Sequence, residues 1–165
     1  MVGFHIVLFE PEIPPNTGNI MRLCANGPAQ LHLIHPLGFE LDDRRLRRAG
    51  LDYREWSRVC EYRSLAEFKE IVPHGRLFAL TTHGARCYAD VSYRDGDVFL
   101  FGPETRGLPQ HVLQDVAEHN RLFLPMMPHS RSLNLANSAA IVLYEAWRQL
   151  AFAGGADERE PMAPS

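Results

Sequence analysis

The chain has 165 residues, of which 45% are hydrophobic and 22% charged, and its formal net charge is −3. This length favours one well-buried domain, and the slightly negative charge excludes a global basic field, so a polyanionic partner would need a local patch. Three separated cysteines without a C-x-x-C motif argue against a disulfide framework or a zinc knuckle and favour the cytoplasm. Residues 153–165 are rich in Gly, Ala, Pro and acids and predict a disordered tail, which leaves residues 1–152 as the domain.

Short, continuous apolar runs predict buried strands. They lie at residues 6–9, 31–35, 77–80, 98–101 and 122–124. Because these runs alternate with helical patterns, we predict an α/β fold with right-handed crossovers between the strands of one parallel sheet. Ligands of such sheets bind beyond the carboxyl ends of the strands. The loops at 81–84, 102–107 and 125–132, which follow the last three runs, are therefore expected to converge on one site. No run approaches the about 18 apolar residues of a membrane span, so no membrane is expected as a partner.

A polar group follows the first strand. The first helix is expected at about residues 18–25, with Asn16 or Thr17 as its cap. Asn16, Asn19 and Arg22 are spaced three residues apart and share one broad helical side. Capping explains Asn16, but Asn19 has poor propensity for a helix interior. We interpret the three residues as a polar wall of the site.

An arginine-rich segment follows the second strand. A helix is expected at residues 42–50, with acids in its first turn and four arginines behind them. Residues 42–58 hold six arginines and four acids, with Tyr53 and Trp56 interleaved. A solvated helix face explains such a charge run, and so does a phosphate-contacting patch with aromatic residues for base stacking. Polarity leaves both interpretations open.

The loop after the strand at 98–101 is unusually polar. It carries Glu104, Thr105 and Arg106 between two glycines, with nothing apolar to bury. Glycine allows close approach of the backbone to a ligand and dihedral angles that other residues avoid. We therefore interpret this loop as the floor of the site.

A long last helix is expected, because an apolar stripe at helical spacing runs from Ala136 to Leu150. Ile141 and Tyr144 lie off this stripe, so a second subunit could cover that face. The N-terminus of this helix, near Ser132, adds a partial positive charge that favours an anion.

Three segments carry a resemblance to a known family. Residues 16–22 (NTGNIMR), 101–108 (FGPETRGL) and 130–137 (SRSLNLAN) resemble, in order and spacing, the signature motifs of the SpoU/TrmH branch of the SPOUT RNA 2′-O-methyltransferases. Further segments, 10–19, 47–53 and 144–148, are similar to the tRNA (cytidine/uridine-2′-O)-methyltransferases of this family, which modify the wobble nucleotide (position 34) of leucine tRNAs.

The resemblance implies a fold and partners. The fold would be an α/β knot, a trefoil formed where the C-terminal segment threads through a loop. S-adenosylmethionine would bind in the knot and leave as S-adenosylhomocysteine, without a metal. The partners would be the anticodon stem-loop of a tRNA and a second copy of the chain, packed through the first and last helices.

The resemblance also implies site residues. Cofactor contacts would come from Leu80, Gly102, Leu124, Ser132 and Leu133. The catalytic group would be Arg22, Glu104, Ser132 and Asn134. For RNA binding we predict the two asparagines of the polar wall and four arginines: Asn16, Asn19, Arg44, Arg45, Arg48 and Arg131.

Methyl transfer requires the ribose 2′-oxygen in line with the methyl group and stripped of its proton. A guanidinium stays protonated in nearly any site, so we predict that Arg22 binds a substrate phosphate and steadies the developing alkoxide, while that phosphate or a water takes the proton. Glu104 is expected to orient an arginine or the backbone, and Asn134 to hold the loop or the ribose.

Other functions remain open. One is 2′-O-methylation of another tRNA position or of rRNA, and a second is a knotted RNA-binding protein without catalysis. A dinucleotide-binding enzyme is a third possibility, but no G-x-G-x-x-G follows the first strand.

Overall fold

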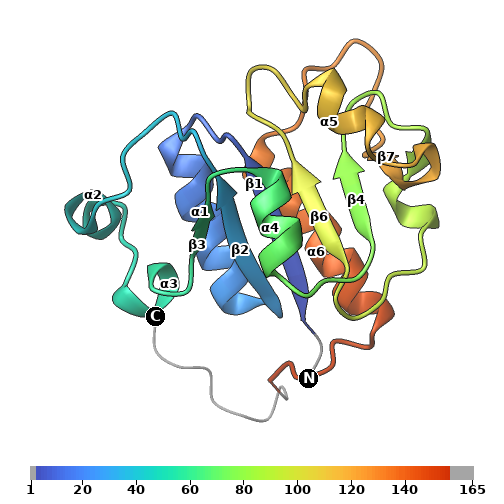
Figure 1. Ribbon diagram of the computed structural model, residues 1–165. Coiled ribbons are helices and arrows are strands. Elements are labelled where there is room, and N and C mark those ends of the chain that lie inside the picture. The colour runs from blue at the N-terminus through green and yellow to red at the C-terminus, as the bar shows by residue number, and fades with distance from the viewer. Residues whose placement is uncertain (1–2, 157–165) are drawn as a thin grey trace.

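The computed structural model describes residues 3–156, apart from the side chain of Tyr53. Within these residues, seven strands form one parallel sheet in the order β3-β2-β1-β6-β4-β7-β5 (Figure 1). The strands are β1 (Phe4–Phe9), β2 (Ala29–Ile34), β3 (Cys60–Tyr62), β4 (Leu77–Leu80), β5 (Arg86–Cys87), β6 (Val98–Phe101) and β7 (Arg121–Phe123). The structure confirms the predicted α/β class and parallel sheet, and the trefoil knot stays a prediction.

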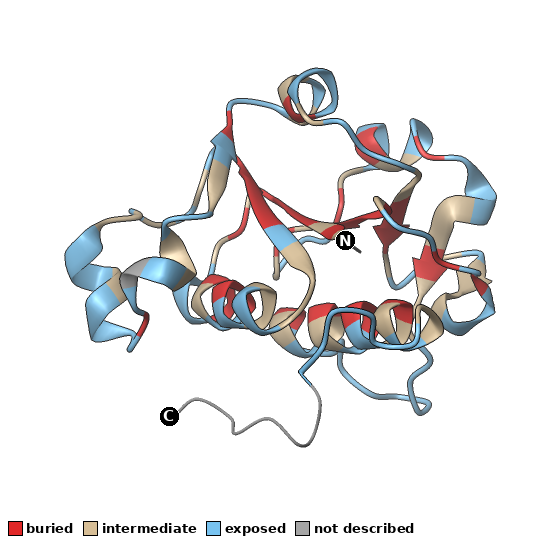
Figure 2. Ribbon diagram, turned by 90° about the horizontal axis from the view of Figure 1, so that it is seen from below, coloured by how far each residue is buried: buried red, intermediate tan, exposed pale blue. Residues whose placement is uncertain are grey.

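Helices cover both faces of the sheet. They are α1 (Pro14–Asn26), α2 (Asp43–Arg48), α3 (Tyr53–Trp56), α4 (Leu65–Ile71), α5 (Gln110–Gln114) and α6 (Leu135–Gln149), with 3₁₀ turns η1 (Tyr88–Asp90) and η2 (Glu118–Asn120). Helices α1 and α6 pack on one face, and α4 and α5 on the other (Figures 1 and 2). No helix within residues 3–156 is both long and apolar enough to cross a membrane.

The covered faces explain why the central strands are continuous apolar runs. Along β1, Phe4, Ile6 and Leu8 join the core beneath α1 and α6, whereas Val7 and Phe9 join the core beneath α4 and α5. Burial of one such side chain stabilises the fold by about 1.5–3 kcal/mol, so both faces hold the strand in register. The short edge strands β3 and β5 have no such run, and the sequence did not reveal them.

Helix α1 begins at Pro14, which corrects the predicted start near residue 18. Pro14 and Pro15 occupy the first turn, where a helix needs no backbone N–H donor, and Ile13 is the N-cap without a side-chain bond. Asn16 and Thr17 are therefore not caps, and both are buried in the helix. Prolines suit a loop as well as a first turn, and this ambiguity displaced the predicted start by one turn.

The other helices follow their predicted patterns more closely. Asp42 caps α2 by accepting a hydrogen bond from the N–H of Arg45, and Gly50 follows with a φ of 77°. Helix α6 leaves Ile141 and Tyr144 exposed, as predicted. The segment after this helix folds back against it, because the indole N–H of Trp147 donates a hydrogen bond to the carbonyl of Ala153. Of the predicted tail, residues 157–165 lie outside the described residues.

A chain of polar rings crosses three neighbouring strands. Nδ1 of His5 lies 3.0 Å from Nε2 of His32, whose Nδ1 lies 3.0 Å from the hydroxyl of Tyr62. Phe68 of α4 covers the chain and meets the His32 ring edge-on. Burial, followed by the nearby His5, lowers the pKa of His32 to about 3. His32 is thus a neutral core residue, whereas His35 is exposed and lies 2.8 Å from Glu61.

We expect mild acid to destabilise the fold through His32. Because its folded-state pKa lies below that of a free histidine, the unfolded chain binds more protons between the two values. The stability is complete above about pH 6.5 and should fall by about 2 kcal/mol by about pH 5, measured by urea unfolding. His32→Phe should flatten this pH profile and the exposed control His35→Phe should leave it steep. An unchanged slope in His32→Phe would contradict the assignment.

Candidate functional site

The three predicted loops converge at the carboxyl ends of β4, β6 and β7. Together with the first turn of α1 and the start of α6 they line a cavity of about 580 Å³. Every residue predicted to contact a cofactor lies on its wall: Leu80, Gly102, Leu124, Ser132 and Leu133. Glu104, Asn134 and Asn16 line the same cavity. Segments far apart in the sequence thus form one site, as the parallel sheet predicted.

Gly102 is required by the shape of its loop. A β-carbon at this position would collide with the backbone of Gly107 and Leu108, which folds back against it. Gly107 has a φ of 67° and donates a hydrogen bond of 2.8 Å to the carbonyl of Pro103. The loop therefore closes on itself, and its two glycines line the cavity without a side chain that would cover the backbone.

Two glutamates fasten this loop to the loop after β1. The carboxylate of Glu104 accepts hydrogen bonds from the backbone N–H groups of Glu12, at 2.7 Å, and Ile13, at 3.1 Å. In return, the carboxylate of Glu12 accepts the hydroxyl of Thr105, at 2.7 Å, and its N–H, at 3.1 Å. The bond from the Thr105 hydroxyl, followed by that from its N–H, lowers the pKa of Glu12. Arg106 adds ion pairs to Glu10 and Glu12 on the exposed side.

Asn134 joins the last helix to the first. Its side-chain oxygen accepts hydrogen bonds from the N–H groups of Ala136 and Asn137 and so caps α6. Its amide nitrogen donates to Oδ1 of Asn16 in α1, at 2.9 Å. Helix α6 therefore begins at Leu135, with Asn134 as its N-cap in place of the predicted Ser132, and this end of the helix lines the cavity.

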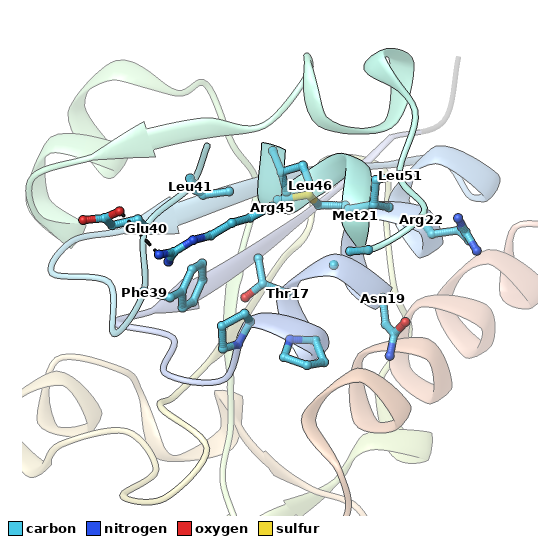
Figure 3. A pocket seen from close by; sticks show the side chains of 14 residues that line it. Thr17, Asn19, Met21, Arg22, Phe39, Glu40, Leu41, Arg45, Leu46 and Leu51 are labelled. Atoms are coloured by element: carbon cyan, nitrogen blue, oxygen red, sulfur yellow. Dashed lines mark ion pairs between the residues drawn. The ribbon is translucent and has the colours of Figure 1, made fainter. Parts of the chain in front are cut away.

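Arg22 lies apart from this group. Its Nη2 donates to the carbonyl of Gly50, at 2.6 Å, and its Nε lies 3.2 Å from Glu55. Arg22, Asn19 and Arg45 line a second cavity of about 310 Å³ between α1 and α2 (Figure 3). Asn16 lines the first cavity and Asn19 and Arg22 line the second, so the three residues do not form the predicted polar wall. Six residues of helix turn through about 600°, which leaves Arg22 about 120° around the helix from Asn16.

Family comparison agrees with the convergence of the three motifs. The SpoU rRNA methylase family matches residues 3–144 of the chain. The chain belongs to this family. A relative from Saccharophagus degradans (strain 2-40), named tRNA (cytidine(34)-2′-O)-methyltransferase, is 58% identical over 151 residues, which cover 92% of this chain and 98% of the relative.

Solved structures give the same grouping. A crystal structure from Bacillus anthracis has a TM-score of 0.86 and 46% identity, and the match covers 94% of this chain and 99% of that one. A second structure, described as giving insights into the 2-OH methylation of C/U34 on tRNA, has a TM-score of 0.81 and 44% identity. The match covers 92% of this chain and 98% of that one. The chain thus spans nearly the whole length of these SpoU relatives.

The arginine-rich segment of this SpoU chain contains exposed arginines that form no ion pair with the described residues. Arg44, Arg47 and Arg48 of α2 are exposed, and none forms an ion pair with any residue that the structure describes. Arg45 is paired, lying 3.7 Å from Glu40 and 3.5 Å from Asp42. Arg131 is exposed beside the first cavity. Exposed charges without protein partners fit a solvated helix face and a phosphate-contacting patch alike, so both interpretations stay open.

Glu12 was missed as a site residue, and Thr105, which lies in the loop predicted as the floor of the site, was given no role of its own. Thr105 lines the first cavity, and Glu12 holds it there. An acid among prolines and a hydroxyl 93 residues later carry no local signal of their pairing. The pairing of β1 with β6 brings the two loops together, and it was not predicted from the sequence.

Loss of the Asn134 side chain should destabilise the protein through two interactions that can be removed separately. Asn134→Ala removes the α6 cap and the bond to Asn16, and should lower the free energy of unfolding by about 1–2 kcal/mol in urea. Asn134→Ser keeps a capping oxygen and loses only the reach to Asn16, so it should lose less. Asn137→Ala, an exposed change one turn along α6, serves as the matched control. Equal losses of stability in Asn134→Ala and Asn137→Ala would contradict the capping role of Asn134.

Proposed function

We propose that this SpoU chain is an S-adenosylmethionine-dependent 2′-O-methyltransferase that modifies the wobble nucleotide, position 34, of leucine tRNAs in the cytoplasm. The observation that supports it is the single cavity built by the three motif segments. The name of the relative at 58% identity, which specifies cytidine 34 of tRNA, supports the position. Leucine tRNAs and the anticodon stem-loop are the finer part of the proposal.

The first cavity suits the proposed cofactor. Its volume of about 580 Å³ falls in the range of small-molecule sites, which combine apolar walls with a few polar groups. Leu80, Leu124 and Leu133 supply apolar walls, and the backbone at Gly102 permits close approach. S-adenosylmethionine, when bound, supplies the methyl group from a positively charged sulfonium.

The polar residues around this cavity are positioning groups. Both carboxylate oxygens of Glu104 accept backbone N–H groups, so we assign Glu104 to holding the loop and not to removing a proton. Asn134 orients α6 and Asn16 in the same way. Ser132 is exposed at the wall, where it is free to contact cofactor or ribose.

Arg22 remains the proposed electrostatic group. It would bind a substrate phosphate and steady the developing alkoxide, while the phosphate or a water takes the proton. Because Arg22 lines the second cavity and not the first, we propose that a homodimer completes each site with the arginine of the other copy. Ile141 and Tyr144, 38% and 43% exposed on α6, offer an apolar surface for that contact.

The deciding experiment maps methyl groups on RNA. Purified protein should transfer labelled methyl groups from S-adenosylmethionine to bulk tRNA, and mapping should place them on the 2′-oxygen of nucleotide 34 in leucine tRNAs. Labelling at another tRNA position or in rRNA would correct the substrate. RNA binding without labelling would establish a non-catalytic RNA-binding protein and overturn the proposal.

Arg22→Lys keeps the charge and loses the planar fork of the guanidinium. We expect turnover to fall by about 100-fold or more, as for removal of a transition-state donor. The affinity for S-adenosylmethionine, measured by calorimetry, should change less than about threefold. Arg63→Lys, a matched change at an exposed arginine beside α4, should alter neither value. Equal losses of turnover and cofactor affinity would refute this role.

Replacing the unpaired arginines of α2 should weaken RNA binding in a salt-dependent way. Each lost phosphate contact lowers the slope of log affinity against log salt by about 0.7–0.9. The triple variant Arg44→Ala, Arg47→Ala, Arg48→Ala should therefore lower the slope by about 2, measured by tRNA binding at several salt concentrations. Arg63→Ala is the control. Unchanged affinity in the triple variant would leave the segment a solvated helix face.

A further inference from the structure

The second cavity borders Arg22, but its apolar interior has no role in the function proposed so far. It lies between the first half of α1 and residues 39–51, and its volume is about 310 Å³ (Figure 3). Its walls include Met21, Phe39, Leu46 and Leu51. A cavity of this size with mostly apolar walls resembles a ligand site more than a packing defect, because core voids are usually smaller than a few water molecules.

One buried hydroxyl points to a ligand. Thr17 is only 1% exposed, it lines this cavity, and its Oγ1 has no hydrogen-bond partner among the described residues. Figure 3 shows this oxygen on the side of Thr17 that faces Phe39. Burial of an unpaired hydroxyl costs free energy that a methyl group in its place would not cost. The polar edge of a ligand would supply the missing partner.

The rim of the cavity is basic. Arg22 and Arg45 line it, and the unpaired arginines of α2 lie beside it. Glu40, the acid among the lining residues, lies 3.7 Å from Arg45 and is offset by it. An apolar interior, one hydrogen-bonding group and a cationic rim together match a planar base joined to phosphates.

The two cavities flank one turn of helix. Asn16 lines the first cavity, whereas the next residue, Thr17, lines the second. Both cavities therefore border the first turn of α1. We propose that the second cavity holds one unpaired base of the RNA substrate, splayed out of the loop that carries the methylated ribose. This inference rests on the proposed RNA substrate and adds a base-binding site to it.

The test uses a synthetic anticodon stem-loop with the fluorescent base 2-aminopurine at one loop position at a time. Fluorescence of this base rises when it leaves a base stack. At one position, binding of the wild-type protein should raise the fluorescence. Thr17→Val, which keeps the shape and removes the hydroxyl, should weaken stem-loop binding by about three- to tenfold. Its stability in urea should equal or exceed that of the wild type, since no partner is lost.

A second pair of variants guards against indirect effects. Ala49→Leu enlarges an exposed residue at the cavity wall, and Ala66→Leu makes the same change on α4, away from both cavities. The first should abolish the rise in fluorescence and the second should not. If Thr17→Val lowers the stability in urea, the hydroxyl is structural and the proposal fails.

The remaining outcomes separate this inference from the proposed function. Methylation without a fluorescence change at any loop position would overturn the base site and leave the methyltransferase intact. A Thr17-dependent rise without methylation would support the base site and overturn the enzymatic proposal. Binding of free AMP as tight as that of the stem-loop would assign the cavity to a free nucleotide. A changed dimer dissociation constant in Ala49→Leu, with RNA binding unaltered, would assign it to the partner subunit. Both of these last results would refute the proposal.

Discussion

The reciprocal hydrogen bonds between two loops set the position of everything else at the site. Strands β1 and β6 are neighbours, with Leu8 opposite Phe101, so the loops that follow them leave the sheet side by side. Glu104 holds the backbone at Glu12 and Ile13, and Glu12 holds Thr105. Helix α1 begins at the next residue, so these bonds also fix its start.

This arrangement leaves neither Glu12 nor Glu104 free to act as a general base at the first cavity. The carboxylates of Glu12 and Glu104 are occupied by hydrogen-bond donors, and the donors from Thr105 lower the pKa of Glu12. Asn134 is occupied by the α6 cap and by Asn16. Positioned groups of this kind favour catalysis by alignment and electrostatics over proton removal by a side chain. The proton would then leave through substrate or solvent, which agrees with a protonated Arg22.

Local patterns in the sequence predicted the central elements, and long-range pairing decided the rest. The apolar runs predicted the bounds of β4 and β6 correctly. Both strands are covered on both faces, so apolar residues continue without alternation from the first residue of each strand to the last. The edge strand β5 has two residues and no such run. The loops after β4, β6 and β7 converge because these three strands are parallel, a property that the sequence predicted. The partnership of Glu12 with Thr105 depended on which strands are neighbours, and no local signal encodes that.

The error over Arg22 is informative about the site. A helix that began at residue 18 would have put Asn19 in its first turn and Arg22 in its second. The earlier start at Pro14 instead carries Arg22 to the third turn, where Gly50 and Glu55 hold it. The same two bonds join α1 to the segment that bears the unpaired arginines of α2. RNA contacts made by that segment would therefore act directly on the orientation of Arg22, so binding and catalysis would share one set of hydrogen bonds.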